Sequence, residues 1–103
     1  MLNQLENEFH EAMLNIYRQA KSEASYDARR FIQMVETHGG IESARRLINA
    51  ATVSEGYTTL WERQHLDLTV EAMIMRTEKY HSLFTEDELD VCAQRLKDYE
   101  YQI

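Results

Sequence analysis

The chain has 103 residues, 44% of them hydrophobic, and its 11 lysines and arginines against 18 aspartates and glutamates give a formal net charge of -7. This length predicts one domain with one modest core, which leaves little room for a deep substrate cleft. The negative charge disfavours direct binding to nucleic-acid phosphates and anionic membranes, and it suits a basic partner or simply solubility.

Hydrophobic residues recur at helical spacing along the whole chain, and no segment alternates apolar and polar residues for long. A first helix is predicted over residues 2–22, and its apolar stripe continues almost in phase as far as residue 37. Residues 2–37 could therefore form one long helix. We favour a kink or turn near Ser22–Ser25, because a domain of this size packs better with shorter elements. The stripe of the first helix contains Leu2, Leu5, Phe9, Ala12 and Ile16.

The second helical segment, residues 26–37, is predicted to end at Gly39-Gly40, because glycine tolerates the left-handed conformation that ends helices. A third helix is expected from Ile41 to Ala51. The stretch "TVSEG" at 52–56 is rich in capping residues and predicts a turn. A short helix is expected from Tyr57 to Arg63.

Asp67 is predicted to cap a further helix, and Thr85 to cap the last one. Glu88 follows Thr85 by three residues, which is the spacing of a capping box. These elements predict an all-α fold: a compact bundle of five or six short helices in a single helical domain over residues 1–103. The residues expected in the core include Leu47, Ile48, Val70, Met73, Ile74, Leu89 and Leu96.

Three stretches, "RRFIQMVETHGGIESARRLI", "GYTTLWERQHLDLTVEAM" and "LFTEDEL", resemble a small all-helical bacterial domain family of unknown function. The likeness covers most of the chain. It implies a bacterial or phage origin, and it carries no activity that can be transferred.

The single cysteine, Cys92, excludes an internal disulfide and is expected to be a small core residue. The start of the chain lacks the basic and apolar regions of a signal peptide. No segment approaches the roughly 18 apolar residues of a membrane span. The sequence therefore predicts a cytoplasmic protein that does not enter membranes.

Metal binding and catalysis are both disfavoured by the sequence. Glu62 and His65, and again Glu78 and His81, have the Glu-x-x-His spacing found in di-iron bundles. Each pair lies in a charged setting near a predicted helix end, so we expect no metal site. No glycine-rich elbow, phosphate loop or paired base accompanies Cys92. We therefore expect no enzyme activity, no catalytic residues and no cofactor.

The double glycine followed by a helix with two adjacent arginines raises the alternative of a helix-turn-helix that reads DNA. Its outer face would then offer Glu42, Arg45, Arg46 and Asn49, residue types that can contact bases or phosphates. The net charge of -7 makes direct nucleic-acid binding an unfavourable interpretation. A second nucleic-acid-linked alternative is an acidic inhibitor that occupies a partner's basic groove. The acidic surface for this role would be residues 85–103, which contain six acids against Arg95 and Lys97. Alternatively, these residues form only a solvated, solubilising helix face.

Tyr57 and Trp61 are four residues apart and so share one helix face. We expect Trp61 to fill the core, with a binding surface as the alternative, because both roles are common for tryptophan. The stripe of the first helix can likewise pack internally or pair with a second copy of the chain. The sequence predicts a non-catalytic helical protein-interaction module that binds another protein or itself. Its candidate interaction surface is Arg45, Arg46, Asn49, Tyr57 and Trp61.

Overall fold

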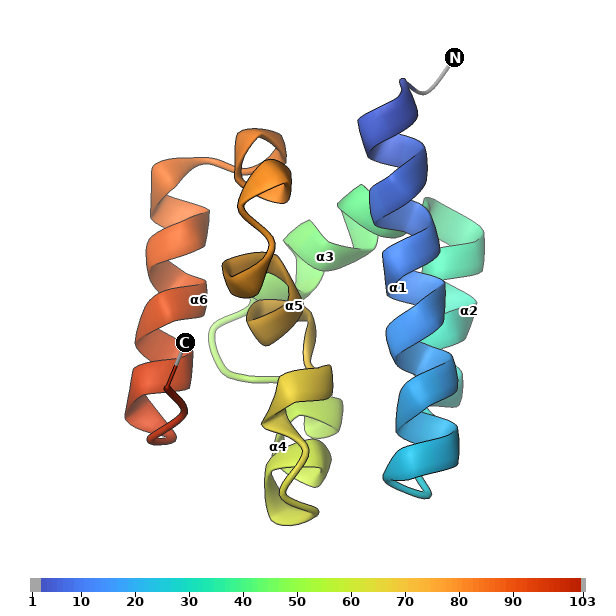
Figure 1. The fold of residues 1–103 in the computed structure, drawn as a ribbon, viewed down its shortest axis with the longest axis vertical. Helices are drawn as coiled ribbons and strands as arrows, with labels where there is room; N and C mark the ends of the chain where they lie inside the picture. The colour runs from blue at the N-terminus through green and yellow to red at the C-terminus, as the bar shows by residue number, and fades with distance from the viewer. Residues whose placement is uncertain (1–2, 103) are drawn as a thin grey trace.

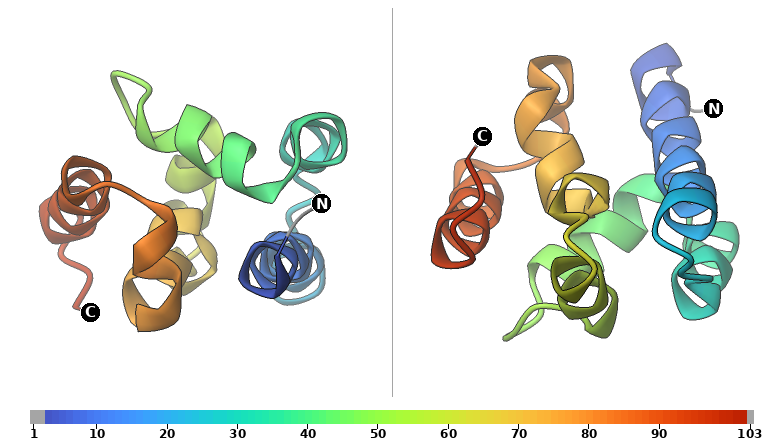
Figure 2. Two further views of the ribbon diagram at one scale, coloured as in Figure 1. Left: turned by 90° about the horizontal axis from the view of Figure 1, so that it is seen from above. Right: turned by 60° about the horizontal axis from the view of Figure 1, so that its bottom comes forward.

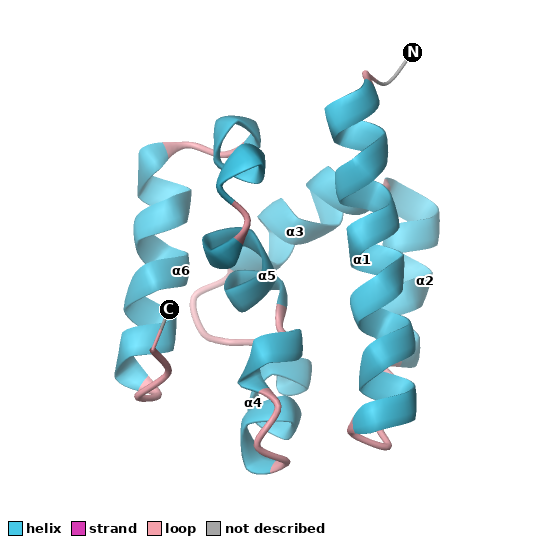
Figure 3. Cartoon of the chain, viewed as in Figure 1, coloured by secondary structure: helices cyan, strands magenta, loops and turns pink. Residues whose placement is uncertain are grey.

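The computed structural model describes residues 3–102, and these residues form helices joined by short connections, with no strand among them (Figure 3). The all-α prediction is confirmed. Leu2, which the first predicted helix includes, lies outside the described residues. The α-helices are α1 (Gln4–Glu23), α2 (Arg29–His38), α3 (Gly40–Ile48), α4 (Glu55–Glu62), α5 (Val70–Arg76) and α6 (Glu86–Asp98), with two 3-10 helices, η1 (Leu66–Leu68) and η2 (Glu78–Leu83).

The two flanks of the molecule are the α1–α2 pair on one side and α6 on the other, with α5 between them (Figure 1). Seen from above, α3 runs across from α2 towards the centre (Figure 2). The main core gathers where these helices meet, around Phe9 of α1, Ile48 of α3 and Ile74 of α5. Phe9 packs edge-on against the rings of Tyr80 and Phe84. None of the helices in the described part is long and apolar enough to cross a membrane.

Most of the predicted core is buried. Leu47 and Leu89 are only half-buried, and both pack against the edge of the main cluster. In α6 the buried face includes Glu88 and Arg95, so Leu89 is turned towards its margin. The predicted core residues that are buried are Ile48, Val70, Met73, Ile74 and Leu96.

The predicted break between the first two helices is confirmed. α1 ends at Glu23, and Ser25 adopts a left-handed φ of 53° before α2 begins at Arg29. The turn is held from outside: Arg63, at the end of α4, donates hydrogen bonds of 2.8 and 2.7 Å to the carbonyl oxygens of Ala24 and Ser25. Two sequence segments 38 residues apart therefore fix one another.

Gly39 and Gly40 have different structural roles. Gly39 takes a φ of 84°, which ends α2 and starts α3 directly. Gly40 allows α3 to approach α1, because a Cβ atom there would lie 2.8 Å from the Cα atom of His10. The backbone N–H of Gly40 donates to Nδ1 of His10 at 3.0 Å, so a side chain of α1 caps the start of α3. The double glycine is thus a packed corner of the bundle.

The structure corrects the prediction that Asp67 caps a helix. Thr69 is the N-cap of α5, and its hydroxyl accepts a hydrogen bond from the backbone N–H of Ala72 at 3.2 Å. Asp67 lies inside η1, where the chain takes a tight turn that buries both Leu66 and Leu68 before the helix begins. Burial of these two leucines therefore outweighs the local capping preference of aspartate.

The other helix boundaries differ from the predicted ones by a few residues. α3 ends at Ile48 rather than Ala51, and α4 begins at Glu55 because Ser54 caps it by accepting from the N–H of Tyr57 at 3.0 Å. The predicted capping box of α6 is confirmed. Thr85 Oγ1 accepts from the N–H of Glu88 at 3.1 Å, and Glu88 Oε1 accepts from the N–H of Thr85 at 2.9 Å.

Replacing Ser43 with alanine is expected to raise the free energy of unfolding by about 1 kcal/mol. The Ser43 side chain is fully buried in α3, and its hydroxyl oxygen has no hydrogen-bond partner among the described residues. Removing the hydroxyl removes the cost of burying it unpaired. Urea unfolding followed by circular dichroism measures the change. Asn15→Ala, at an exposed position of α1, reports the effect of helix propensity alone. A less stable Ser43→Ala protein would contradict this interpretation.

Candidate functional site

The structure divides the predicted interaction surface into two groups. In the first, Arg45 and Asn49 hold α3 against the start of α6. Arg45 Nη2 donates to the carbonyl oxygen of Leu83 at 3.1 Å, and its Nε atom lies 3.7 Å from Oε1 of Glu88. Asn49 Nδ2 donates to Glu88 Oε2 at 2.9 Å. Arg46 is exposed and pairs at 2.9 Å with Glu42 one turn earlier.

Glu88 is the centre of this first group. Burial pushes the pKa of its carboxyl upwards, but the hydrogen bonds from the Thr85 N–H and from Asn49, with the charge of Arg45, outweigh burial and lower the pKa below its usual value. The carboxylate therefore stays ionised and joins α3 to α6. All four polar side chains that a helix-turn-helix would turn towards DNA already have partners inside the chain.

The second group contains Tyr57 and Trp61, and the structure places them differently from the prediction. Tyr57 is 2% exposed, so it belongs to the core and not to an interaction surface. Its hydroxyl donates to the carbonyl oxygen of Arg95 at 3.0 Å, and burial raises its pKa. Trp61 is 46% exposed, which corrects the expectation that it fills the core. It occupies the last turn of the short helix α4, where its ring packs edge-on against Tyr99, the residue after α6.

Two tyrosine rings connect this exposed tryptophan to the core. The ring centroids of Trp61 and Tyr99 are 5.3 Å apart, and those of Tyr99 and Tyr57 are 5.0 Å apart, both in edge-on geometry. We call Tyr57, Tyr99 and Trp61 the aromatic row. Edge-on stacking stabilises such pairs beyond the burial of area. The row therefore holds an exposed indole on a fixed support.

The C-terminal region, which includes Tyr99 of the aromatic row, is acidic. Arg95, which the sequence suggests as a surface base, is turned inwards and pairs with Glu71 at 3.0 Å. Lys97 is exposed on the same helix. Glu88 is buried as well, so the exposed charge of the C-terminal region is as negative as its composition indicates. The exposed acids of this region are Glu86, Asp87, Asp90, Asp98 and Glu100.

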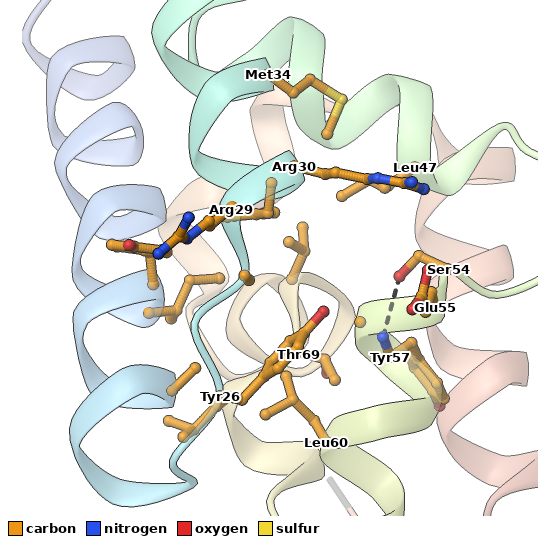
Figure 4. Close-up of a pocket in the computed structure, with 18 of the residues that line it drawn as sticks. Tyr26, Arg29, Arg30, Met34, Leu47, Ser54, Glu55, Tyr57, Leu60 and Thr69 are labelled. Carbon is orange, nitrogen blue, oxygen red and sulfur yellow. Dashed lines mark hydrogen bonds between the residues drawn. The ribbon is translucent and has the colours of Figure 1, made fainter.

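A pocket of about 570 Å³ lies between α1, α2, α4 and the start of α5 (Figure 4). Its walls include Ile16, Leu60 and Val70, and Arg29 and Arg30 stand at its edge. The sequence does not predict this pocket. No local signal marks it, because its walls come from segments that only the tertiary structure brings together.

The polar groups at this pocket are partly paired. The Tyr17 hydroxyl donates to Asp27 at 2.7 Å, and Arg29 donates to the same carboxylate at 3.3 Å. These hydrogen bonds, that of Tyr17 above all, lower the pKa of Asp27. Burial raises the pKa of the Tyr26 hydroxyl, and the negative charge of Glu55 raises it further. Tyr26 therefore presents a protonated hydroxyl within the pocket.

The two Glu-x-x-His pairs do not converge on a common point. Nε2 of His81 lies 3.0 Å from the carbonyl oxygen of Ile74, and His65 Nδ1 lies 3.6 Å from Asp67. Over residues 3–102, no three histidine, cysteine, aspartate or glutamate side chains lie together in a way that could hold a metal ion. That the protein needs no metal or cofactor stays a prediction.

Cys92 is expected to react with a thiol reagent such as dithiobis(nitrobenzoate) at least about tenfold more slowly in the folded protein than in urea at the same pH. Cys92 is fully buried, as predicted, and burial raises the pKa of its thiol to about 12, with Glu71 adding to the rise. Almost none of the thiol is therefore ionised at pH 8. Absorbance at a fixed pH measures both rates, and equal rates would show that the thiol is accessible.

The stripe of the first helix faces the chain's own core. Phe9 is 0% and Ile16 is 5% exposed, whereas Leu5 and Ala12 are half-buried. Pairing of two chains through this helix would have to use its margins. Self-association stays a prediction, which light scattering after size-exclusion chromatography measures directly.

No protein-family model matches the chain, and neither the curated proteins nor the solved structures include one with significant similarity to it. The resemblance to a bacterial helical domain therefore stays a prediction from the sequence. The function has to be argued from the chain's own surface.

Proposed function

We propose that this chain is a non-catalytic helical protein-interaction module that docks a partner on the exposed end of the aromatic row. One observation carries the proposal. Trp61 is the large hydrophobic side chain left exposed in residues 3–102, and it is 46% exposed. Isolated apolar side chains on a surface are common, but an exposed tryptophan braced by a tyrosine is a typical binding hot spot.

The support under Trp61 favours binding. The indole rests on Tyr99, which rests on the buried Tyr57, so the ring is held before a partner arrives. A side chain that is already ordered loses less conformational entropy on binding. The entropic cost of ordering the Trp61 side chain on binding is accordingly low.

The charges around the aromatic row define the chemistry of the partner. Glu62 follows Trp61 in the chain, Asp98 and Glu100 flank Tyr99, and all three acids are exposed. A lysine or arginine of the partner can pair with these carboxylates and lie over the face of the indole ring. We therefore propose a protein partner that presents an apolar side chain next to basic ones.

A displayed library of random peptides, selected on the unmodified protein alone and then compared for binding to Trp61→Ala, tests this proposal. Enrichment of sequences that combine lysine or arginine with an apolar residue would support it. Enrichment of acidic sequences, or of sequences that bind Trp61→Ala equally well, would contradict it. Glu78→Ala, on the 3-10 helix η2, is the matched control for an exposed position outside the aromatic row.

The second candidate is the acidic inhibitor of a nucleic-acid-binding protein. The exposed C-terminal surface supports it, because this surface keeps five acids against Lys97 while Glu88 and Arg95 are both buried. If the chain is such an inhibitor, the basic groove of its partner would bind α6. Asp87→Asn together with Asp90→Asn would then weaken the complex more than Trp61→Ala does. The opposite order would favour the aromatic row.

A cytoplasmic location and a bacterial or phage origin belong to the same proposal. A single buried cysteine, held as a thiol, fits a reducing compartment. The origin rests on the sequence resemblance alone.

A further inference from the structure

The pocket between α1, α2 and α4 has the size and lining of a small-molecule site. Its volume of about 570 Å³ falls within the range of about 300–1,000 Å³ that is typical of such sites. Its inner walls are apolar and come from four elements, with Ile16 on α1, Leu60 on α4, Leu68 in η1 and Val70 on α5. An apolar body of a ligand would be removed from water there.

Two of the charges that line the pocket are neutralised within the chain. Asp27 accepts from Tyr17 at 2.7 Å and pairs with Arg29 at 3.3 Å. Glu71, which also lines the pocket, pairs with Arg95 at 3.0 Å. These carboxylates have their partners already, and they do not call for a cationic ligand.

Arg30 is left without an ion pair or hydrogen bond among residues 3–102, and its long side chain extends over the pocket towards Leu47 and Ser54 (Figure 4). Arg30 is the second residue of α2, whose N-cap, Ala28, provides no side-chain hydrogen bond. The partial positive charge of this helix end adds to that of the guanidinium. The α2 edge of the pocket is therefore suited to an anionic group.

The α4 edge of the pocket carries a negative charge. Glu55 begins α4, and Figure 4 shows it with Ser54 across the pocket from Tyr26. A second acidic group of a ligand would meet this carboxylate and be repelled. Both charges act on the Tyr26 hydroxyl in the pocket: Glu55 raises its pKa and Arg30 lowers it. It can donate a hydrogen bond to an anion held by Arg30.

We propose that this pocket binds an amphipathic monocarboxylate, with the carboxylate at Arg30 and the Tyr26 hydroxyl and the apolar body between Ile16, Leu60 and Val70. A fatty acid of medium chain length has this chemistry. The pocket shares the buried Tyr57 with the aromatic row, but neither Trp61 nor Tyr99 lines it. The inference therefore goes beyond the proposed function, which rests on the exposed Trp61, and either can fail without the other.

Titration calorimetry with decanoate, compared with decyltrimethylammonium, tests the charge preference below the concentrations at which either probe forms micelles. We expect one decanoate per chain, bound at least about tenfold more tightly than the cation, because only the anion pairs with Arg30. Equal affinity for the two probes would overturn the proposal, since it would show binding by apolar contact alone.

Arg30→Gln tests the headgroup contact. Arg30 is exposed, so the variant is expected to fold, and its affinity for decanoate should fall about tenfold. Arg18→Gln, an exposed arginine of α1 that does not line this pocket, is the matched control and should bind decanoate like the unmodified protein. Equal affinities of the two variants would overturn the assignment of Arg30.

Methyl NMR spectra recorded during the decanoate titration locate the ligand. The methyl signals of Ile16, Leu60 and Val70 should shift, while the indole N–H signal of Trp61 should stay in place. Shifts centred on Trp61 would mean that decanoate adsorbs on the aromatic row, and they would overturn the pocket proposal without affecting the proposed function.

Discussion

Replacing Arg95 with methionine is expected to lower the free energy of unfolding by about 3–5 kcal/mol at pH 7.5, because it leaves a buried carboxylate without its partner. Arg95 Nη1 lies 3.0 Å from Oε2 of Glu71 and 3.0 Å from the carbonyl oxygen of Leu47. Its Nη2 donates to the carbonyl oxygen of Ala50 at 2.8 Å. One guanidinium thus joins α5, α6 and the connection after α3. Lys97→Met, which removes an exposed cation from the same helix, is the matched control and should change stability little.

The loss in Arg95→Met should depend on pH in a defined direction. Burial raises the pKa of Glu71 above its ordinary value, while the hydrogen bond and charge of Arg95 act to lower it. Without Arg95, the pKa of Glu71 in the folded state rises further above its value in the unfolded state. Stability is therefore lost as pH rises above the unfolded-state pKa and is regained as pH falls, when Glu71 takes up a proton.

Urea unfolding of Arg95→Met and the unmodified protein at pH 7.5 and pH 5 measures this dependence. The difference between the two proteins should be smaller at pH 5. The same difference at both values would contradict the role given to the Glu71 carboxylate. A difference below about 1 kcal/mol at pH 7.5 would mean that the pair is not buried as described.

Gly40→Ala is expected to lower the free energy of unfolding by about 1–3 kcal/mol, because a new Cβ atom 2.8 Å from the Cα atom of His10 forces α3 away from α1. The movement would also lengthen the 3.0 Å hydrogen bond from the Gly40 N–H to His10. The matched control is Gly56→Ala. There the nearest atom would be the Tyr26 hydroxyl oxygen at 3.4 Å, and alanine is the better helix former.

Thermal unfolding of the two glycine variants under identical conditions measures the contrast. Gly56→Ala should be as stable as the unmodified protein or slightly more stable, and Gly40→Ala clearly less stable. Equal stability of all three proteins would show that the α1–α3 contact is looser than the structure gives.

The sequence predicted those features that depend on local signals. The capping box at Thr85 and Glu88 requires only residues three apart, and the end of α2 at Gly39 requires only one residue with a positive φ. Helical periodicity likewise identified the buried positions Ile48 and Ile74. Each of these features is decided within a few residues, so the printed sequence contains the necessary information.

The features that the sequence missed depend on contacts between distant segments. Arg95 lies on the inner stripe of α6, but arginine is a residue type that is usually exposed. Its burial can be understood only when its partners, Glu71 and the surrounding carbonyl oxygens, are known. Trp61 and Tyr57 share a helix face, yet α6 covers Tyr57 and leaves Trp61 46% exposed. Arg45 and Asn49 looked like recognition residues because Glu88, their partner, is far away in the sequence.

The affinity of Trp61→Ala for a selected basic peptide tests the central claim, docking on the aromatic row, most directly. A tryptophan at a hot spot contributes at least about 2 kcal/mol, so calorimetry should show binding weakened by about thirtyfold. Arg46→Ala removes an exposed side chain of α3 and should leave the affinity unchanged. A Trp61→Ala protein that binds the peptide as tightly as the Arg46→Ala protein would contradict the claim.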